Sequence, residues 1–250
     1  MVHRIITKWR FPITREIDRR VQLSWVTKRA ALSTKRNYCY FRIPKCANST
    51  IVRTLVYYDP DLAYDESDRS GNYAKGCFGH LLDSEARTIR EFTERYFSFT
   101  FVRNPYSRLL SGYLHKIVEK SATSDRYRAI IDEMKTTAEQ TPTFGDFIRY
   151  LENGGLWKNP HWVPQTAMLP VQPQHLSFVG KVESIQDDLR TVVDRIFGDG
   201  TFKESKTRET HRQGASGKLN EFYTPDIQQR VYRLYRDDFE AFSYDFDLPT

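Results

Sequence analysis

Hydrophobic residues follow two different periods along this chain, and each change of period marks a predicted element. Residues 38–43 (YCYFRI) are mostly aromatic or β-branched, which is typical of a strand. Pro44 ends that segment, and the apolar residues of 51–56 recur at helical spacing. The pattern therefore predicts a strand, a loop and a helix, with Ser49 or Thr50 as the helix cap.

A second unit of the same kind is predicted further along the chain. Phe97, Phe99 and Phe101 alternate with other residues, which is the period of two expected of a strand over 97–103. Asn104 ends this strand, and Pro105 suits the first position of a helix. The buried face of that helix would comprise Leu109, Leu110, Tyr113 and Ile117.

A third strand is predicted over 176–180, followed by a helix that ends near residue 197, and a last helix is predicted to begin at Thr224-Pro225. Strands that alternate with helices predict an α/β fold: a three-layer sandwich with a central, mainly parallel β-sheet flanked by helices. We expect residues 1–36 to form an N-terminal helical extension with one or two short helices, and residues 37–250 to form a single domain.

Two loops of this predicted fold carry residues suited to binding anions. Ligands bind parallel sheets at the carboxyl ends of the strands, where loops 44–50 and 103–111 would lie. The first loop enters a helix N-terminus, whose N–H groups and dipole favour a phosphate or sulfate, and Lys45 adds a mobile charge. Arg103 and Ser111 could bind a second phosphate. The first loop lacks the glycines of a Walker A motif, and Lys45 could instead be a solvated lysine in an ordinary turn.

The net charge, the cysteines and the lack of a long apolar stretch indicate which ligands and which cellular compartment to expect. The formal net charge of +6 and the pI near 9.1 favour anionic ligands, but the basic residues are dispersed among acids, so we expect no nucleic-acid partner. Three cysteines match no zinc motif and favour a reducing compartment. Because no apolar stretch is long enough to span a membrane and no signal peptide is evident, we expect a cytoplasmic protein. The alternative is the Golgi lumen, if a membrane anchor was removed.

Longer motifs resemble a known family. PKCANST resembles the 5′-phosphosulfate loop of sulfotransferases that use 3′-phosphoadenosine-5′-phosphosulfate (PAPS), and FVRNPYSRLLSGY resembles their 3′-phosphate site. The likeness runs from about residue 38 to 246 and is greatest to carbohydrate sulfotransferases of the chondroitin and HNK-1 type, the sulfotransferase family 2-like group. Segments 160–165, 179–183 and 232–246 share it. Unlike many of these relatives, the chain lacks a cysteine pair after His161-Trp162.

The resemblance implies a P-loop-like fold, PAPS as co-substrate, adenosine 3′,5′-bisphosphate as product, a glycan or other hydroxyl-bearing acceptor, and no metal. A loop around residues 206–218 resembles the segment that closes over PAPS, although it could also be a charge-rich surface loop that binds no ligand. The residues that the resemblance assigns to PAPS are Pro44, Lys45, Cys46, Ala47, Asn48, Ser49, Thr50, Arg103, Ser111, Arg208 and Arg212.

The implied reaction is an in-line displacement at sulfur. Lys45 would stabilise the charge that grows on the leaving phosphate, and a histidine would remove the proton of the acceptor hydroxyl. His80 resembles the histidine of heparan-sulfate sulfotransferases, and His161 is the alternative base; either could instead be a hydrogen-bonded structural histidine. Two other functions stay open: a P-loop-type small-molecule kinase, and a non-catalytic module that binds polyanions or nucleic acid.

Overall fold

The structure is a computed structural model that describes residues 11–63, 65, 67–68, 71–119, 125–134, 141–203 and 216–249. The chain divides into two compact units. The first unit consists of Met1–Val102 and Gln165–Thr210, and the second unit consists of Arg103–Pro164 and His211–Thr250.

The first unit is built on a β-sheet. Within its described part the sheet has four strands in the order β1-β2-β3-β4, where β1 pairs antiparallel with β2 and the other neighbours pair in parallel. The strands are β1 (Ala30–Ser33), β2 (Tyr38–Phe41), β3 (Phe97–Val102) and β4 (Phe178–Lys181). The predicted α/β fold with a mainly parallel sheet is confirmed.

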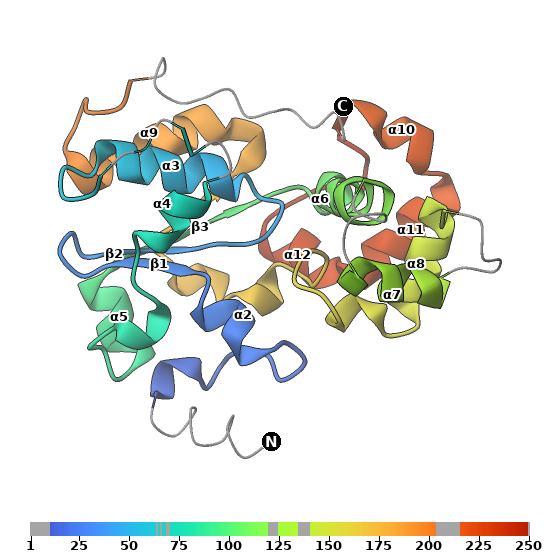
Figure 1. Cartoon of the computed structure of the whole chain (residues 1–250), viewed down its shortest axis with the longest axis horizontal. Helices are drawn as coiled ribbons and strands as arrows, with labels where there is room; N and C mark the ends of the chain where they lie inside the picture. Colours follow the sequence, from blue (N-terminus) through green and yellow to red (C-terminus); the bar gives the residue numbers. More distant parts are fainter. Residues whose placement is uncertain are drawn as a thin grey trace. The chain divides into compact units, whose positions relative to one another are not determined.

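Helices pack on both faces of this sheet (Figure 1). On one face, the Tyr40 and Phe99 rings stack with their centroids 5.2 Å apart and join a buried cluster with residues of α3 and α9. On the other face, the ring of Phe41 packs against the ring of Phe92 in α5, with their centroids 5.8 Å apart. The helical segments of this unit are η1 (Pro12–Thr14), α2 (Leu23–Thr27), α3 (Asn48–Tyr58), α4 (Asn72–Gly76), η2 (Leu81–Asp83), α5 (Ile89–Arg95), η5 (Thr166–Met168), η6 (Pro173–His175), η7 (Val182–Ser184) and α9 (Ile185–Phe197).

The segment predicted as an N-terminal helical extension contains a strand as well as short helices. Besides η1 and α2 it contains β1, which the sequence analysis did not predict. Leu32 of β1 lies opposite Cys39 of β2, and its backbone also bridges to Gly79, with both N–H···O distances at 3.0 Å. The domain boundary at residue 36 stays a prediction.

The second unit is helical in its described part. Asn104 caps α6 by accepting a hydrogen bond from the Tyr106 N–H at 3.0 Å, and Pro105 occupies the first turn as predicted. Thr224-Pro225 likewise begins α11. The helical segments are α6 (Pro105–Tyr113), the π-helical η3 (Leu114–Val118), α7 (Asp125–Met134), α8 (Phe144–Glu152), η4 (Gly155–Trp157), η9 (Ser216–Lys218), α10 (Leu219–Phe222), α11 (Pro225–Leu234) and α12 (Arg236–Ala241).

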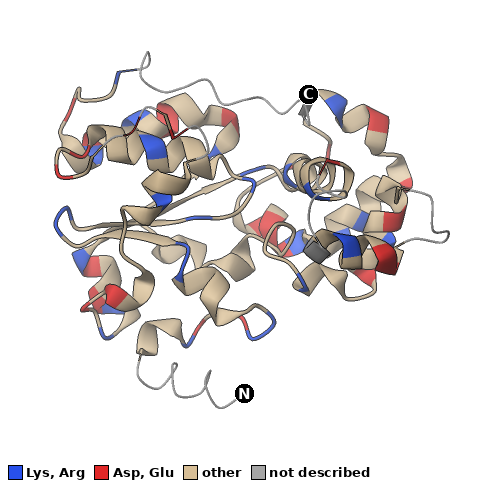
Figure 2. Ribbon diagram, viewed as in Figure 1, with Lys and Arg blue, Asp and Glu red and all other residues tan. Residues whose placement is uncertain are grey.

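Charged residues of both signs are mixed along the described part of each unit (Figure 2). Lys and Arg residues are interspersed with Asp and Glu residues along the helices (Figure 2), as the sequence analysis expected. Among the helices that the structure describes, none combines the length and the apolar character that crossing a membrane requires.

Candidate functional site

The loop between β2 and α3 has an unusual backbone. Lys45 and Ala47 have positive φ angles of 70° and 53°, a left-handed conformation that costs a non-glycine residue about 1–2 kcal/mol. The Cys46 N–H donates to the Ile43 carbonyl at 3.3 Å, which closes the turn between them. Left-handed turns direct successive N–H groups to one side and so favour an anion there.

The first turn of α3 opens onto this loop. The helix begins at Asn48, and its N-cap is Ala47, which makes no side-chain cap hydrogen bond. The prediction that Ser49 or Thr50 caps the helix is therefore wrong, because both residues lie inside the first turn. Because the cap residue carries only a methyl group, no side-chain oxygen at the cap competes with an anion for the first turn of α3 and the positive end of its dipole.

Side chains beneath the loop hold it in place. The buried Cys46 thiol lies 3.2 Å from the Oε1 atom of Gln165, which is also buried. The Tyr40 hydroxyl donates to Oδ1 of Asn48 at 2.9 Å. Cys46 and Asn48 thus use their side chains to fix the loop to residues beneath it.

A second lysine, which the sequence analysis did not identify, lies beside the first turn of α3. The Nζ atom of Lys75 on α4 is 3.4 Å from Oγ of Ser49 and 3.3 Å from Oδ1 of Asn72. Burial, and then the positive charge of Arg42, lower the pKa of the Lys75 ammonium from its ordinary value. No local sequence pattern marks Lys75, because Ser49 precedes it by 26 residues.

Gly71 explains how α4 comes so close to α3. Its φ angle is +69°, and a Cβ atom added to it would lie 3.0 Å from both Cα and Cβ of Ser49. Any side chain at this position would push the start of α4 away from the first turn of α3, and Lys75 with it.

His80, the histidine proposed first as the base, belongs to the same unit as the Lys45 loop. It follows the bridged Gly79 and is exposed. Its backbone N–H donates to the Asp83 carboxylate at 2.6 Å, which fixes the main chain at the start of η2.

Arg103, Ser111 and His161 belong to the second unit. Arg103 is half-buried immediately before α6, and Ser111 is buried within that helix. The fully buried Arg108 of α6 donates to the Val163 carbonyl at 2.9 Å. This bond ties the segment that carries His161 to the helix that carries Ser111.

Arg208 and Arg212 lie outside the described residues. Within the part of the chain that the structure covers, no group of three or more His, Cys, Asp or Glu side chains could hold a metal ion. That Lys45 and Arg103 bind the same nucleotide stays a prediction, since they belong to different units.

Comparisons with known proteins agree with the motifs. The model of the sulfotransferase family matches residues 28–245. The chain is 31% identical over 223 residues to carbohydrate sulfotransferase 14 of Mus musculus, covering 83% of this chain and 57% of the relative. It is 30% identical over 234 residues to carbohydrate sulfotransferase 11 of Danio rerio, covering 83% of this chain and 64% of the relative. The chain thus spans less than two thirds of the length of these curated relatives. No solved structure matches it.

Proposed function

Because this chain belongs to the sulfotransferase family, we propose that it transfers a sulfuryl group from PAPS to a hydroxyl group of a carbohydrate. The relatives at 30–31% identity are named carbohydrate sulfotransferases, which supports a glycan as the acceptor. The observation that carries the proposal is the loop before α3, where a family motif coincides with a strained backbone and a helix N-terminus whose cap is an alanine.

The loop suits the phosphosulfate end of PAPS. The first-turn N–H groups of α3, the hydroxyls of Ser49 and Thr50 and the ammonium of Lys45 are all donors, and a phosphate next to sulfate offers only acceptors. In the proposed complex, Arg103 and Ser111 bind the 3′-phosphate, for which the planar fork of arginine is well suited. Arg208 and Arg212 are proposed as further contacts to the nucleotide.

The proposed reaction forms one bond to sulfur and breaks another. The acceptor oxygen bonds to sulfur as the bond from sulfur to the bridging phosphate oxygen breaks, and adenosine 3′,5′-bisphosphate leaves. Lys45 stabilises the negative charge that develops on that oxygen, because a fixed positive charge is worth most where charge grows in the transition state.

A histidine accepts the proton of the acceptor hydroxyl in this scheme. His80 and His161 are the two candidates, since an imidazole has an unperturbed pKa close to neutral pH. The net charge of +6 would help to attract both the nucleotide and an acidic glycan. The cytoplasmic location expected from the sequence stays a prediction.

Transfer of radiolabelled sulfate from PAPS to a panel of glycans tests the proposal. We expect wild-type protein to label at least one glycan, and Lys45→Ala to lower the rate about 10²- to 10³-fold, the usual loss of one preorganised donor. Lys28→Ala serves as the matched control, because Lys28 is an exposed lysine of the same unit.

Three results would contradict the proposal. If Lys45→Ala transferred sulfate as fast as the control, Lys45 would have no role at the leaving group. If the wild-type protein bound no adenosine 3′,5′-bisphosphate but bound ATP with Mg²⁺, a kinase would replace a sulfotransferase as the better assignment. Salt-sensitive binding of any polyanion, without selectivity for the bisphosphate, would indicate a non-catalytic module.

A further inference from the structure

His161 lies in a fixed network whose donors and acceptors can be assigned. Oδ1 of the buried Asn159 is 3.0 Å from the backbone nitrogen of His161 and 2.8 Å from the ring atom Nδ1. The Asn159 carbonyl accepts the N–H groups of Trp162 and Val163 at 3.3 and 3.2 Å. Both ends of Asn159 are therefore held by the segment that carries His161.

The backbone N–H of His161 decides which side-chain atom of Asn159 it contacts. The His161 N–H can only donate, so the Asn159 atom that it contacts must be the amide oxygen rather than the amide nitrogen. That oxygen carries no hydrogen, so the short contact to Nδ1 is a hydrogen bond only if Nδ1 bears the proton. In a neutral imidazole with a proton on Nδ1, the lone pair lies on Nε2.

The described contacts of Tyr127, Lys116 and Arg108 are compatible with this assignment. The Tyr127 hydroxyl lies 3.4 Å from Nδ1, a longer and weaker contact than the one from Asn159. The Lys116 ammonium lies 5.1 Å from the centre of the Tyr127 ring, and the guanidinium of Arg108 binds the carbonyls of Val163 and Pro160.

The side-chain amide nitrogen of Asn159 is energetically unfavourable where it lies. This atom, Nδ2, is buried and has no hydrogen-bond partner among the residues that the structure describes. A buried unsatisfied donor typically costs about 1–3 kcal/mol, and an aspartate here would supply the same acceptor without that donor. An asparagine, however, orients the imidazole without placing a negative charge beside it, so it does not stabilise the imidazolium as an aspartate would.

We propose that Asn159 is a positioning residue that holds His161 as the neutral Nδ1–H tautomer, which makes Nε2 the atom that accepts the proton of the acceptor hydroxyl. The catalytic half of this statement rests on the proposed sulfotransferase function. When the hydroxyl oxygen bonds to sulfur, its proton moves to Nε2, and the resulting imidazolium keeps its Nδ1–H bond to Asn159.

Nitrogen-15 NMR of the histidine rings tests the tautomer without reference to activity. The His161 signal, assigned by its loss in His161→Gln, is expected to show a protonated Nδ1 and an unprotonated Nε2 at high pH. Asn159→Ala should shift the population toward the Nε2–H form, whereas Tyr127→Phe should leave it unchanged. Asn153→Ala is the matched control, since Asn153 is an exposed asparagine of the same unit.

Sulfate transfer tests the role in the reaction. We expect His161→Gln to lower kcat about 10²- to 10⁴-fold, as the loss of a general base does, and Asn159→Ala to lower it roughly 10- to 100-fold, the range for residues that orient a functional histidine. Asn159→Asp keeps the acceptor and adds a charge that stabilises the imidazolium. It should therefore retain the Nδ1–H tautomer, raise the pKa of His161 and move the acidic limb of the pH–kcat profile to higher pH.

The outcomes separate this proposal from the function on which it rests. A wild-type His161 in the Nε2–H form, or an Asn159→Ala signal identical to wild type, would overturn the positioning role. Full transfer by His161→Gln, with Lys45→Ala inactive, would overturn the base assignment and leave the sulfotransferase function intact. If no variant and no wild-type protein transferred sulfate, the proposed function would fall and the NMR result would still decide the role of Asn159. Because Asn159→Ala removes a buried side chain, Asn159→Asp serves as a second variant, and an unchanged pH–kcat profile in it would also contradict the contact between residue 159 and Nδ1.

Discussion

At the scale of single residues, substitution of Gly71 should change both the free energy of unfolding and the binding of the nucleotide. Gly71→Ala places a methyl group 3.0 Å from Cα of Ser49 in a left-handed conformation, which should lower the free energy of unfolding by about 1–2 kcal/mol. It should also weaken the binding of adenosine 3′,5′-bisphosphate, because Lys75 moves away from the first turn of α3. Urea denaturation and isothermal titration measure the two effects.

Gly76→Ala is the control for this substitution. Gly76 lies in the same helix, and an added Cβ atom would meet nothing within 4 Å. This variant should bind the nucleotide like the wild type and be equally or slightly more stable, because alanine favours helices. Equal effects of the two substitutions would show that the close approach of α4 to Ser49 is unimportant.

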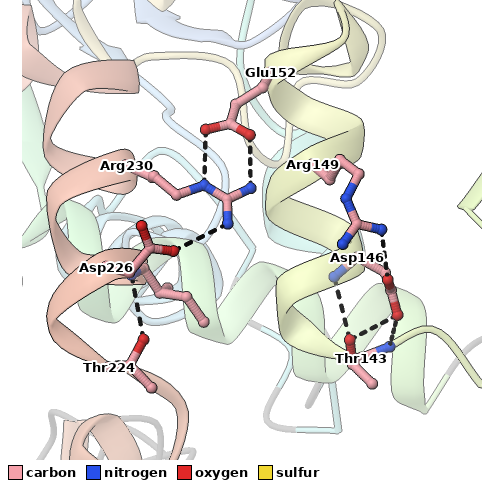
Figure 3. Close-up of polar contacts among 8 residues, drawn as sticks. Thr143, Asp146, Arg149, Glu152, Thr224, Asp226 and Arg230 are labelled. Carbon is pink, nitrogen blue, oxygen red and sulfur yellow. Dashed lines mark hydrogen bonds and ion pairs between the residues drawn. The ribbon is translucent and has the colours of Figure 1, made fainter.

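The hydrogen bonds of Asp146 predict that the free energy of unfolding depends on pH. Its carboxylate accepts the Thr143 hydroxyl and N–H at 2.6 and 3.0 Å in the capping box of α8 (Figure 3). The Thr143 hydrogen bond lowers the pKa of Asp146 below its ordinary 3.8. A carboxylate whose pKa is lower in the folded state stabilises the fold above the unfolded pKa, and this stabilisation disappears as pH falls through the folded pKa.

We therefore expect Asp146→Asn to lower the free energy of unfolding near neutral pH by about 0.5–1 kcal/mol, the lower half of the usual range for a lost helix cap. The difference from wild type should shrink as pH falls below 3.8 and vanish once the pH lies below the lowered pKa of Asp146. Asp237→Asn, at an exposed aspartate of α12, should show no such convergence. A difference that stays constant down to the acid unfolding of the protein would contradict the role of the ionised carboxylate.

How far the sequence predicts single residues depends on the range of the contacts they make. Pro105 and Thr224 were recognisable because a helix cap involves only neighbours in the chain. Lys75 and Asn159 were missed, although their contacts define the two sites most closely. Lys75 depends on a partner 26 residues away, and the importance of Asn159 depends on which of its atoms faces His161.

At the scale of elements, the same distinction decides which strands were found. β2 and β3 consist largely of aromatic residues, so their strand character is visible locally. β1 reads Ala-Ala-Leu-Ser, a composition without β-branched or aromatic residues, and its extended form comes from pairing with β2. The cap of α3 was mispredicted because Ala47 adopts a left-handed conformation that alanine seldom takes.

The pairing of α8 with α11 gives a prediction about an ion pair. Arg230 binds both carboxylate oxygens of Glu152 at 2.9 and 2.7 Å (Figure 3), and these hydrogen bonds raise the pKa of the guanidinium. A double-mutant cycle with Arg230→Ala and Glu152→Ala should give a coupling of about 0.5–1 kcal/mol, because solvent partly screens the pair. The coupling should fall in high salt.

The Arg236–Glu240 pair of α12 is the control, since its side chains are 67% and 57% exposed. A cycle on that pair should give no measurable coupling, although its shortest N···O distance is 2.6 Å. If both pairs gave the same coupling, the bidentate geometry and partial burial of the Arg230 pair would contribute nothing beyond an ordinary surface contact.

At the scale of the whole molecule, thermal denaturation with different ligands compares the three functions that the sequence left open. A ligand at about 100 times its Kd adds about 2.7 kcal/mol of stability. For a protein of this size that amounts to a rise in Tm of roughly 5–10 °C. We expect this rise with adenosine 3′,5′-bisphosphate, and a much smaller one with ATP and Mg²⁺ or with an oligonucleotide.

The same measurement tests whether the two phosphate motifs bind one nucleotide. Lys45→Ala and Arg103→Ala lie in different units, and each should reduce the shift caused by the bisphosphate. A full shift in Arg103→Ala would show that the second motif does not bind the 3′-phosphate. Neither substitution should change the response to an oligonucleotide.

Ala47, the N-cap of α3, finally implies a trade-off between thermal stability and catalytic rate. Asparagine tolerates the left-handed backbone that Ala47 adopts, which relieves part of the strain of about 1–2 kcal/mol, and it adds an amide oxygen beside the first turn of α3. Its amide oxygen, however, would then occupy the donors proposed to hold the sulfate nucleotide. Ala47→Asn should therefore survive heating better in the absence of nucleotide, as calorimetry would record, and should require more PAPS to reach half its maximal rate. Selection for thermal stability alone at this position would therefore weaken the binding of PAPS.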